Sequence, residues 1–79
     1  MTRDEAVALV TGILVQVAPD LAGEELDTGA NLQEEYDLDS MDVLNLVAGV
    51  GNAVGTEIPD RDAAGLRSVD DFAGWCLSH

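Results

Sequence analysis

One hydroxyl side chain, Ser40, stands among carboxylates in the stretch EEYDLDSMDVLN, which runs from Glu34 to Asn45. A serine acts as a nucleophile only when a neighbouring base takes its proton. The only histidine is His79, the last residue of the chain. The sequence also contains no glycine-rich loop that could cradle a phosphate. We therefore predict that the chain has no catalytic residue and is not an enzyme.

The acids around Ser40 raise the question of a calcium site, because Asp37, Asp39 and Asp42 lie close together in the sequence. An EF-hand loop that begins at Asp37 needs an oxygen ligand at its fifth position, glycine at its sixth and glutamate at its twelfth. This chain has Met41, Asp42 and Ala48 there. The pattern fails, so we predict no metal site.

Two interpretations of Ser40 remain. In the first, its oxygen only caps a helix, within an acidic helical module for protein interaction. In the second, another enzyme modifies it, because an anionic group attached there would face the free N–H groups at a helix N-terminus. Asp39 and Asp42 would oppose that group locally, which suggests that a basic modifying enzyme recognises them.

Helical periodicity occurs on both sides of the serine. Apolar residues recur at spacings of three and four from Asp4 to Val17, and Thr2 with Glu5 fits a capping box. The period resumes at Ser40 and continues toward Gly55. The expected buried stripes are Ala6, Val10, Ile13, Leu14 and Val17 in the first helix and Val43, Leu46, Val47, Val50 and Val54 in the second.

The other face of the second predicted helix is uncharged, which is unusual in so acidic a chain. Its residues are Met41, Asn45, Ala48 and Asn52, with Leu44 on the flank. Gly49 and Gly51 lie inside this helix, and each costs about 1 kcal/mol relative to alanine. We therefore expect the helix to fray toward its end, near Gly55.

The remaining segments complete a small bundle. Residues 18 to 39 show no sustained period and read as a long connection, in which Asn31 can cap one short turn. Pro59 begins a short helical segment that ends at Gly65, and Ser68 caps a last helix. The expected anchors of the long connection are Leu26, Leu32, Tyr36 and Leu38. The predicted fold class is all-α: a four-helix bundle with a long first loop and a short third helix.

Composition limits the kinds of partner. Sixteen acids against three arginines give a formal net charge of −13, which repels nucleic acid and favours basic protein surfaces.

Hydrophobic residues make up 47% of the chain, enough for one core, so residues 1–79 are expected to form a single domain. The apolar run from Ala6 to Ala18 is too short to span a bilayer. With no export signal evident, we expect a cytoplasmic monomer that does not enter membranes.

The stretch around Ser40 resembles the signature of a known protein family. The stretch LDSMD is similar to the D-S-L-[DE] signature of the acyl carrier protein family, with Met41 in place of the usual leucine. The similarity extends from Asp39 to Cys76, where TEIPD resembles the stretch that follows the second family helix and SVDDFAGWC resembles the last family helix. The first 38 residues agree only in pattern, as an amphipathic helix followed by a long acidic loop. The resemblance implies a carrier domain over residues 1–79.

The resemblance implies a covalent 4′-phosphopantetheine arm on Ser40, taken from coenzyme A by a phosphopantetheinyl transferase. The thiol of the arm would carry acyl or aminoacyl groups, which a loading ligase or transferase supplies and downstream synthases use. Asp39 and Asp42 would be recognition residues, and Met41 and Leu44 exposed apolar contacts for partner enzymes. The alternative for Met41 and Leu44 is that they are half-buried core residues.

One departure from the family pattern concerns the second helix. Fatty acid synthesis members often carry glutamates along it, whereas this chain has Asn45, Gly51, Asn52 and Ala53. A polar, uncharged face depends more on apolar contact and shape than on charge. We therefore expect a discrete carrier of a specialised pathway.

Overall fold

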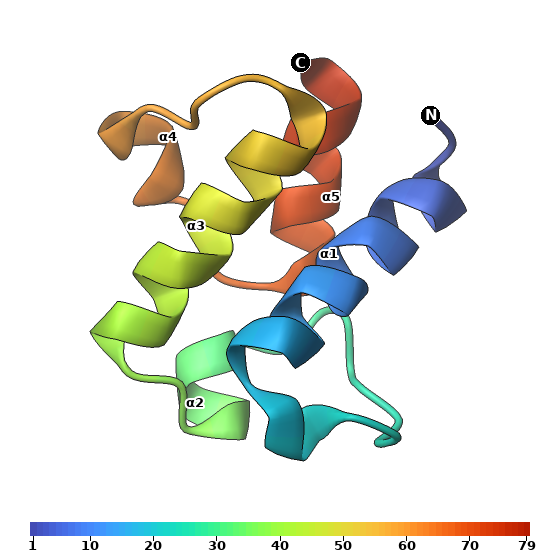
Figure 1. The fold of residues 1–79 in the computed structure, drawn as a ribbon, viewed down its shortest axis with the longest axis vertical. Helices are drawn as coiled ribbons and strands as arrows, with labels where there is room; N and C mark the ends of the chain where they lie inside the picture. Colours follow the sequence, from blue (N-terminus) through green and yellow to red (C-terminus); the bar gives the residue numbers. More distant parts are fainter.

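The computed structural model describes residues 1–79 and contains helices and connections without any strand (Figure 1). The helices are α1 (Arg3–Val17), α2 (Leu32–Tyr36), α3 (Ser40–Val54), α4 (Asp60–Ala63) and α5 (Val69–Ser78), and a 3-10 turn covers Pro19–Leu21. The all-α fold class is confirmed. The expected number of four helices is one too low, because the single turn predicted at Asn31 is a complete short helix, α2.

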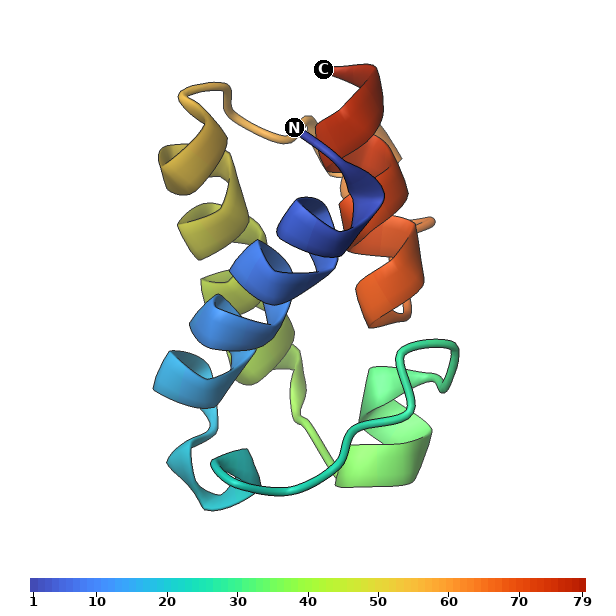
Figure 2. The same ribbon diagram turned by 90° about the vertical axis from the view of Figure 1, so that its right-hand side faces the viewer.

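Helix α1 lies between α3 and α5 and packs against both (Figures 1 and 2). Its buried residues are Ala6, Val10 and Leu14, each at the spacing of about one helical turn. They meet Leu46 and Val50 of α3 on one side. The α5 residues of the same core are Val69, Phe72, Ala73, Trp75 and Cys76. One continuous core therefore joins the three long helices.

The three predicted helix caps, at Thr2, Asn31 and Ser68, are present. At α1, the Thr2 hydroxyl accepts the Glu5 backbone N–H at 3.2 Å, and the Glu5 carboxylate accepts the Thr2 backbone N–H at 2.9 Å. At α5, the Ser68 hydroxyl accepts the Asp71 backbone N–H at 3.1 Å. Such bonds satisfy N–H groups that have no partner inside the helix. The starts of α1 and α5 are therefore set by local sequence.

The long connection is fastened to the bundle at several points. Leu32 and Leu38 are buried, and the Tyr36 hydroxyl accepts the Asp27 backbone N–H at 2.7 Å. The Leu32 N–H donates to the Arg67 carbonyl at 2.8 Å. The expected anchoring role of these side chains is confirmed. As a result, the short segment between α2 and α3 holds the start of α3 in one place.

The two glycines inside α3 have packing reasons. A Cβ at Gly49 would lie 2.7 Å from Ile13 Cγ2 of α1, and one at Gly51 would lie 3.0 Å from the Thr56 carbonyl oxygen. Helix α3 remains helical to Val54 and ends on Gly55 with φ 77°, a left-handed conformation that favours glycine, so the predicted end near Gly55 is confirmed. Close approach of neighbouring backbone and side chains holds this end of α3.

None of the five helices has the length and apolar character that crossing a membrane requires.

Candidate attachment site at the start of helix α3

Ser40 is the first residue of α3, and the residue before it, Asp39, is the cap of this helix. The Asp39 carboxylate accepts the Asp42 backbone N–H at 2.8 Å, and the Asp42 carboxylate faces the Asp39 N–H at 3.5 Å. The interpretation that Ser40 is only a helix cap is therefore wrong. Aspartate caps about as well as serine, and its negative charge is further favoured by the helix dipole.

The Ser40 side chain is exposed, and its hydroxyl has no hydrogen-bond partner within the protein, while the nearby Asp39 and Asp42 carboxylates bond to backbone. Both oxygen lone pairs and the hydroxyl proton are thus open to solvent or to a second protein. No base of this chain lies within hydrogen-bond distance of the hydroxyl. Activation of this hydroxyl as a nucleophile would require a base that takes its proton.

Two large apolar side chains lie exposed close to Ser40. Met41 is 63% exposed and Leu44 is 60% exposed, so the alternative that they are half-buried core residues is wrong. Leu44 is four residues after Ser40, which puts the two side chains on the same face of α3. The uncharged residues Asn45, Ala48 and Asn52 are also exposed, as predicted.

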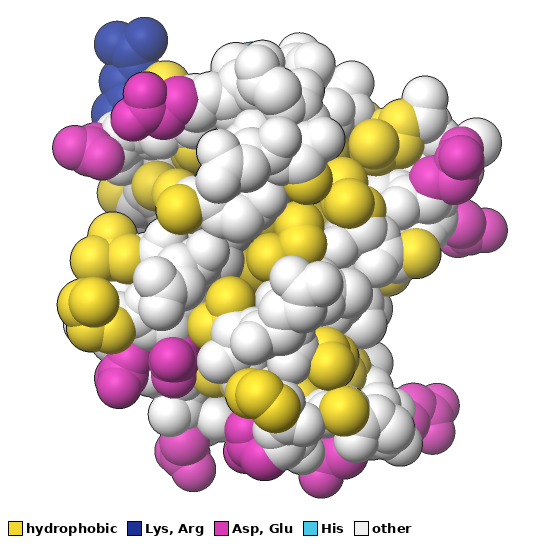
Figure 3. All heavy atoms as spheres, viewed as in Figure 1, with side chains coloured by type: hydrophobic (Ala, Val, Ile, Leu, Met, Phe, Trp, Pro, Cys, Tyr) yellow, Lys and Arg dark blue, Asp and Glu magenta, His cyan; other side chains and the backbone are white.

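The face seen in Figure 3 shows how charge is distributed around this site. Hydrophobic and uncharged atoms cover its centre, over α1 and α3, and acidic side chains gather along its edges. The only Lys or Arg atoms in view lie at the upper left, in the region of α4. An approaching protein therefore meets an apolar, uncharged middle inside a negative border.

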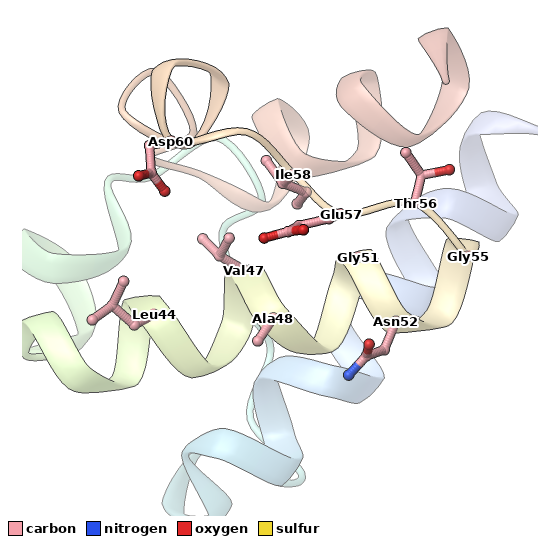
Figure 4. Close-up of a pocket in the computed structure, with 10 residues that line it drawn as sticks. All are labelled: Leu44, Val47, Ala48, Gly51, Asn52, Gly55, Thr56, Glu57, Ile58 and Asp60. Atoms are coloured by element: carbon pink, nitrogen blue, oxygen red, sulfur yellow. The ribbon is translucent and has the colours of Figure 1, made fainter.

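A groove of about 550 Å³ runs along α3 from Leu44 toward Gly55. Figure 4 shows Leu44 and Val47 pointing from α3 toward the opposite loop, and Glu57 reaching back from that loop toward Val47. The full lining consists of Leu44, Val47, Ala48, Gly51, Asn52, Gly55, Thr56, Glu57, Ile58 and Asp60. The groove begins one helical turn beyond Ser40, and it combines an apolar wall with polar groups at its rim.

Our sequence reasoning missed this groove and the residues that form its second wall, Thr56, Glu57 and Asp60. The available signal was Gly51, since a glycine inside a helix often marks a close backbone approach. Here it lets residues 56 to 58 lie against α3.

Cys76 and His79 lie outside the site. Cys76 is buried in α5, and burial raises the pKa of its thiol, which keeps the sulfur protonated and unreactive near neutral pH. His79 stacks on Trp75 with the ring centroids 4.3 Å apart. No three side chains of His, Cys, Asp or Glu are grouped in a way that could hold a metal ion.

Comparison with known proteins agrees with this geometry. A family model described as "Phosphopantetheine attachment site" matches residues 6–76. The meromycolate extension acyl carrier protein of Mycobacterium tuberculosis is 27% identical over 75 residues, which cover 95% of this chain and 64% of the relative. An acyl carrier protein of Rhodococcus erythropolis is 26% identical over 74 residues, covering 94% of this chain and 80% of the relative.

A further acyl carrier protein, from Lactobacillus johnsonii, is 34% identical over 56 residues, which are 71% of this chain and 70% of the relative. The chain spans slightly less than two thirds of the length of the meromycolate extension proteins of Mycobacterium bovis and Mycobacterium tuberculosis. The family model covers nearly all of the chain, including the start of α3. The chain therefore belongs to the phosphopantetheine attachment site family, the acyl carrier type of domain that bears a covalent 4′-phosphopantetheine group.

Proposed function

We propose that this protein is a non-catalytic acyl carrier and that Ser40 is the residue that holds its 4′-phosphopantetheine arm. The observation that carries the proposal is the Ser40 hydroxyl, exposed and without a partner at the first residue of α3. A hydroxyl in this position fits a phosphodiester bond, because the attached anion lies beside the N-terminal end of a helix. When bound, the arm supplies a thiol that holds acyl groups as thioesters.

The attachment is a phosphoryl transfer from coenzyme A. The Ser40 oxygen forms a bond to the phosphorus that bears pantetheine, and the bond from that phosphorus to the departing adenosine 3′,5′-bisphosphate breaks. The hydroxyl proton passes to a base of the phosphopantetheinyl transferase, because this chain offers none nearby. What this chain contributes is the exposed oxygen and the surface around it.

Four side chains near Ser40 support a recognition role in this proposal. Met41 and Leu44 offer apolar contact to the transferase and to later partners, and Asp39 and Asp42 place negative charge next to the reacting oxygen. The groove that starts at Leu44 gives a tethered group a surface to lie along. Because the tether raises the local concentration of the cargo, weak interfaces with partner enzymes suffice.

The partners that fit this role are a phosphopantetheinyl transferase, an enzyme that loads the acyl group, and synthases that use it. The relatives are named acyl carrier proteins, which favours an acyl cargo over an aminoacyl one. We propose that the protein acts in the cytoplasm as a monomer. The uncharged outer face of α3 favours a specialised pathway, so loading by a housekeeping malonyl transferase should be slow.

The intact mass of the protein tests the proposal. After incubation with coenzyme A, magnesium and a broad-specificity phosphopantetheinyl transferase, we expect the mass to increase by one phosphopantetheine. Ser40→Ala should abolish the increase, whereas Ser78→Ala, which removes another exposed hydroxyl, should leave it intact. A protein that gains no mass, or one that gains it with Ser40 replaced, contradicts the proposal.

A further inference from the structure

We propose that Asp39 acts as a positioning residue for attachment of the arm, because its side chain occupies the cap position and so keeps the Ser40 hydroxyl free. This inference rests on the proposed function of Ser40. It differs from a recognition role for the Asp39 charge, since what it requires is the hydrogen-bond geometry of the side chain.

Asp39 and Ser40 are adjacent residues that compete for one position. Both residue types are among the strongest helix caps. In the structure Asp39 has the extended backbone of a cap, with φ −88° and ψ 177°, and its carboxylate accepts the Asp42 N–H at 2.8 Å. Ser40 already lies inside the helix. Asp39 is therefore the residue that caps α3, and the Ser40 oxygen has no backbone partner.

Loss of the Asp39 side chain would reverse this outcome. The helix would begin one residue later, with Ser40 in an extended conformation and its oxygen accepting an N–H of the first turn. The bond from the Val43 N–H to the Asp39 carbonyl, now 3.1 Å, would be exchanged for one to the Ser40 side chain. Leu38, which is buried, anchors the chain just before this point, so the shift stays local.

A capping serine is a poorer acceptor for the arm. Its lone pair is held by a backbone N–H, and the oxygen turns toward the helix end, away from an approaching enzyme. That bond must break before the oxygen can attack phosphorus. One net hydrogen bond corresponds to a factor of up to about ten in rate.

Three substitutions at one position separate geometry from charge. Asp39→Asn keeps a strong cap and removes the charge; Asp39→Glu keeps the charge on a longer side chain that is not a favoured cap; Asp39→Ala removes both. We expect kcat/KM of arm transfer by the broad-specificity transferase to fall about tenfold in the Ala and Glu variants. Asp39→Asn removes the charge that the transferase is proposed to recognise but keeps the cap, so its kcat/KM should fall less than that of Asp39→Glu.

The control is Ser68→Ala, which removes a comparable cap bond of 3.1 Å from α5. It should lower stability without slowing arm transfer. A second readout is the Ser40 carbon chemical shifts, which should move from helical to extended values in the Ala and Glu variants and remain helical in the Asn variant.

The result that overturns the inference is a Glu variant that accepts the arm faster than the Asn variant, since that order reports charge recognition. Helical Ser40 shifts in the Ala variant also overturn it. If the unchanged protein accepts no arm, the proposed function fails, and the Ser40 chemical shifts still decide whether Asp39 holds the register of the helix.

Discussion

Among single residues, hydrogen bonds between carboxylates and backbone N–H groups determine which side chains near Ser40 remain free. Asp39 and Asp42 bond to the backbone around Ser40, and the serine itself is left free. At the start of α1, the Thr2 and Glu5 side chains likewise each accept the backbone N–H of the other residue. The same capping chemistry therefore secures the start of α1 and, at the start of α3, leaves the Ser40 oxygen exposed.

Glu5 gives a prediction of pH dependence. The Thr2 backbone N–H, followed by the Thr2 hydroxyl, lowers the pKa of Glu5 below its ordinary value of 4.5. A carboxylate with a lowered pKa in the folded state stabilises the protein above its unfolded pKa, and this contribution is lost as the pH falls through the folded pKa. The protein should therefore be more stable than Glu5→Ala at neutral pH, and the difference should narrow below about pH 4.5.

Urea denaturation of the two proteins at several pH values measures this difference. Comparing the pair cancels the effect of acid on the other fifteen acidic groups, since both proteins share them. A difference that stays constant, or that widens on acidification, would contradict the assigned role of the Thr2 and Glu5 hydrogen bonds.

At the scale of helices, the crossing of α1 and α3 depends on Gly49. Only a residue without a Cβ leaves space for Ile13, whose methyl group Cγ2 would lie 2.7 Å from the added atom. Ile13 is β-branched and has little freedom to turn away. This close approach holds α3 against α1. Helix α3 also carries Ser40 and forms one wall of the groove.

Replacing Gly49 with alanine tests this packing. Alanine favours a helix by about 1 kcal/mol over glycine, but forcing an extra methyl group into a packed contact costs about 1–3 kcal/mol. We expect the free energy of unfolding of Gly49→Ala to decrease on the order of 1 kcal/mol. The matched control is Gly12→Ala in α1, where an added Cβ meets nothing within 4 Å, and stability should rise by about 0.5–1 kcal/mol.

Chemical denaturation of the two glycine variants supplies the comparison. If Gly49→Ala proves as stable as Gly12→Ala, the contact with Ile13 is not a constraint on this crossing.

At the scale of the whole molecule, electrostatic repulsion opposes folding. The chain has sixteen acids and only three arginines, and the one ion pair joins Arg3 of α1 to Asp70 of α5 at 3.2 Å. That pair is exposed and contributes little in water. Apolar packing of the three long helices must therefore hold the bundle against a formal net charge of −13.

Salt should accordingly stabilise the protein. Raising the ionic strength from about 0.01 M to about 1 M shortens the Debye length from about 30 Å to about 3 Å, which weakens repulsion between distant carboxylates. We expect the melting temperature, followed by circular dichroism, to rise with sodium chloride and to rise at lower concentrations of a divalent cation. A melting temperature that falls or does not change in moderate salt would refute this explanation.

The long helices, most of the helix caps and the candidate serine could be predicted without a structure. Apolar residues at helical spacing, and hydroxyl or carboxylate side chains just before them, act within one or two turns, so they can be read without a fold. The caps at Thr2 and Ser68 and the motif around Ser40 are such local signals. The short helix α2 was predicted only in part, as a single turn at Asn31.

The remaining features depend on contacts between segments that lie far apart in the chain. Met41 and Leu44 had two equally open interpretations, and their exposure follows from which face of α3 the other helices cover. The groove exists because residues 55 to 60 return alongside α3, a contact between segments that no local pattern specifies. The structure also shows that Asp39, and not Ser40, caps α3, which local sequence left open because both residue types are good caps.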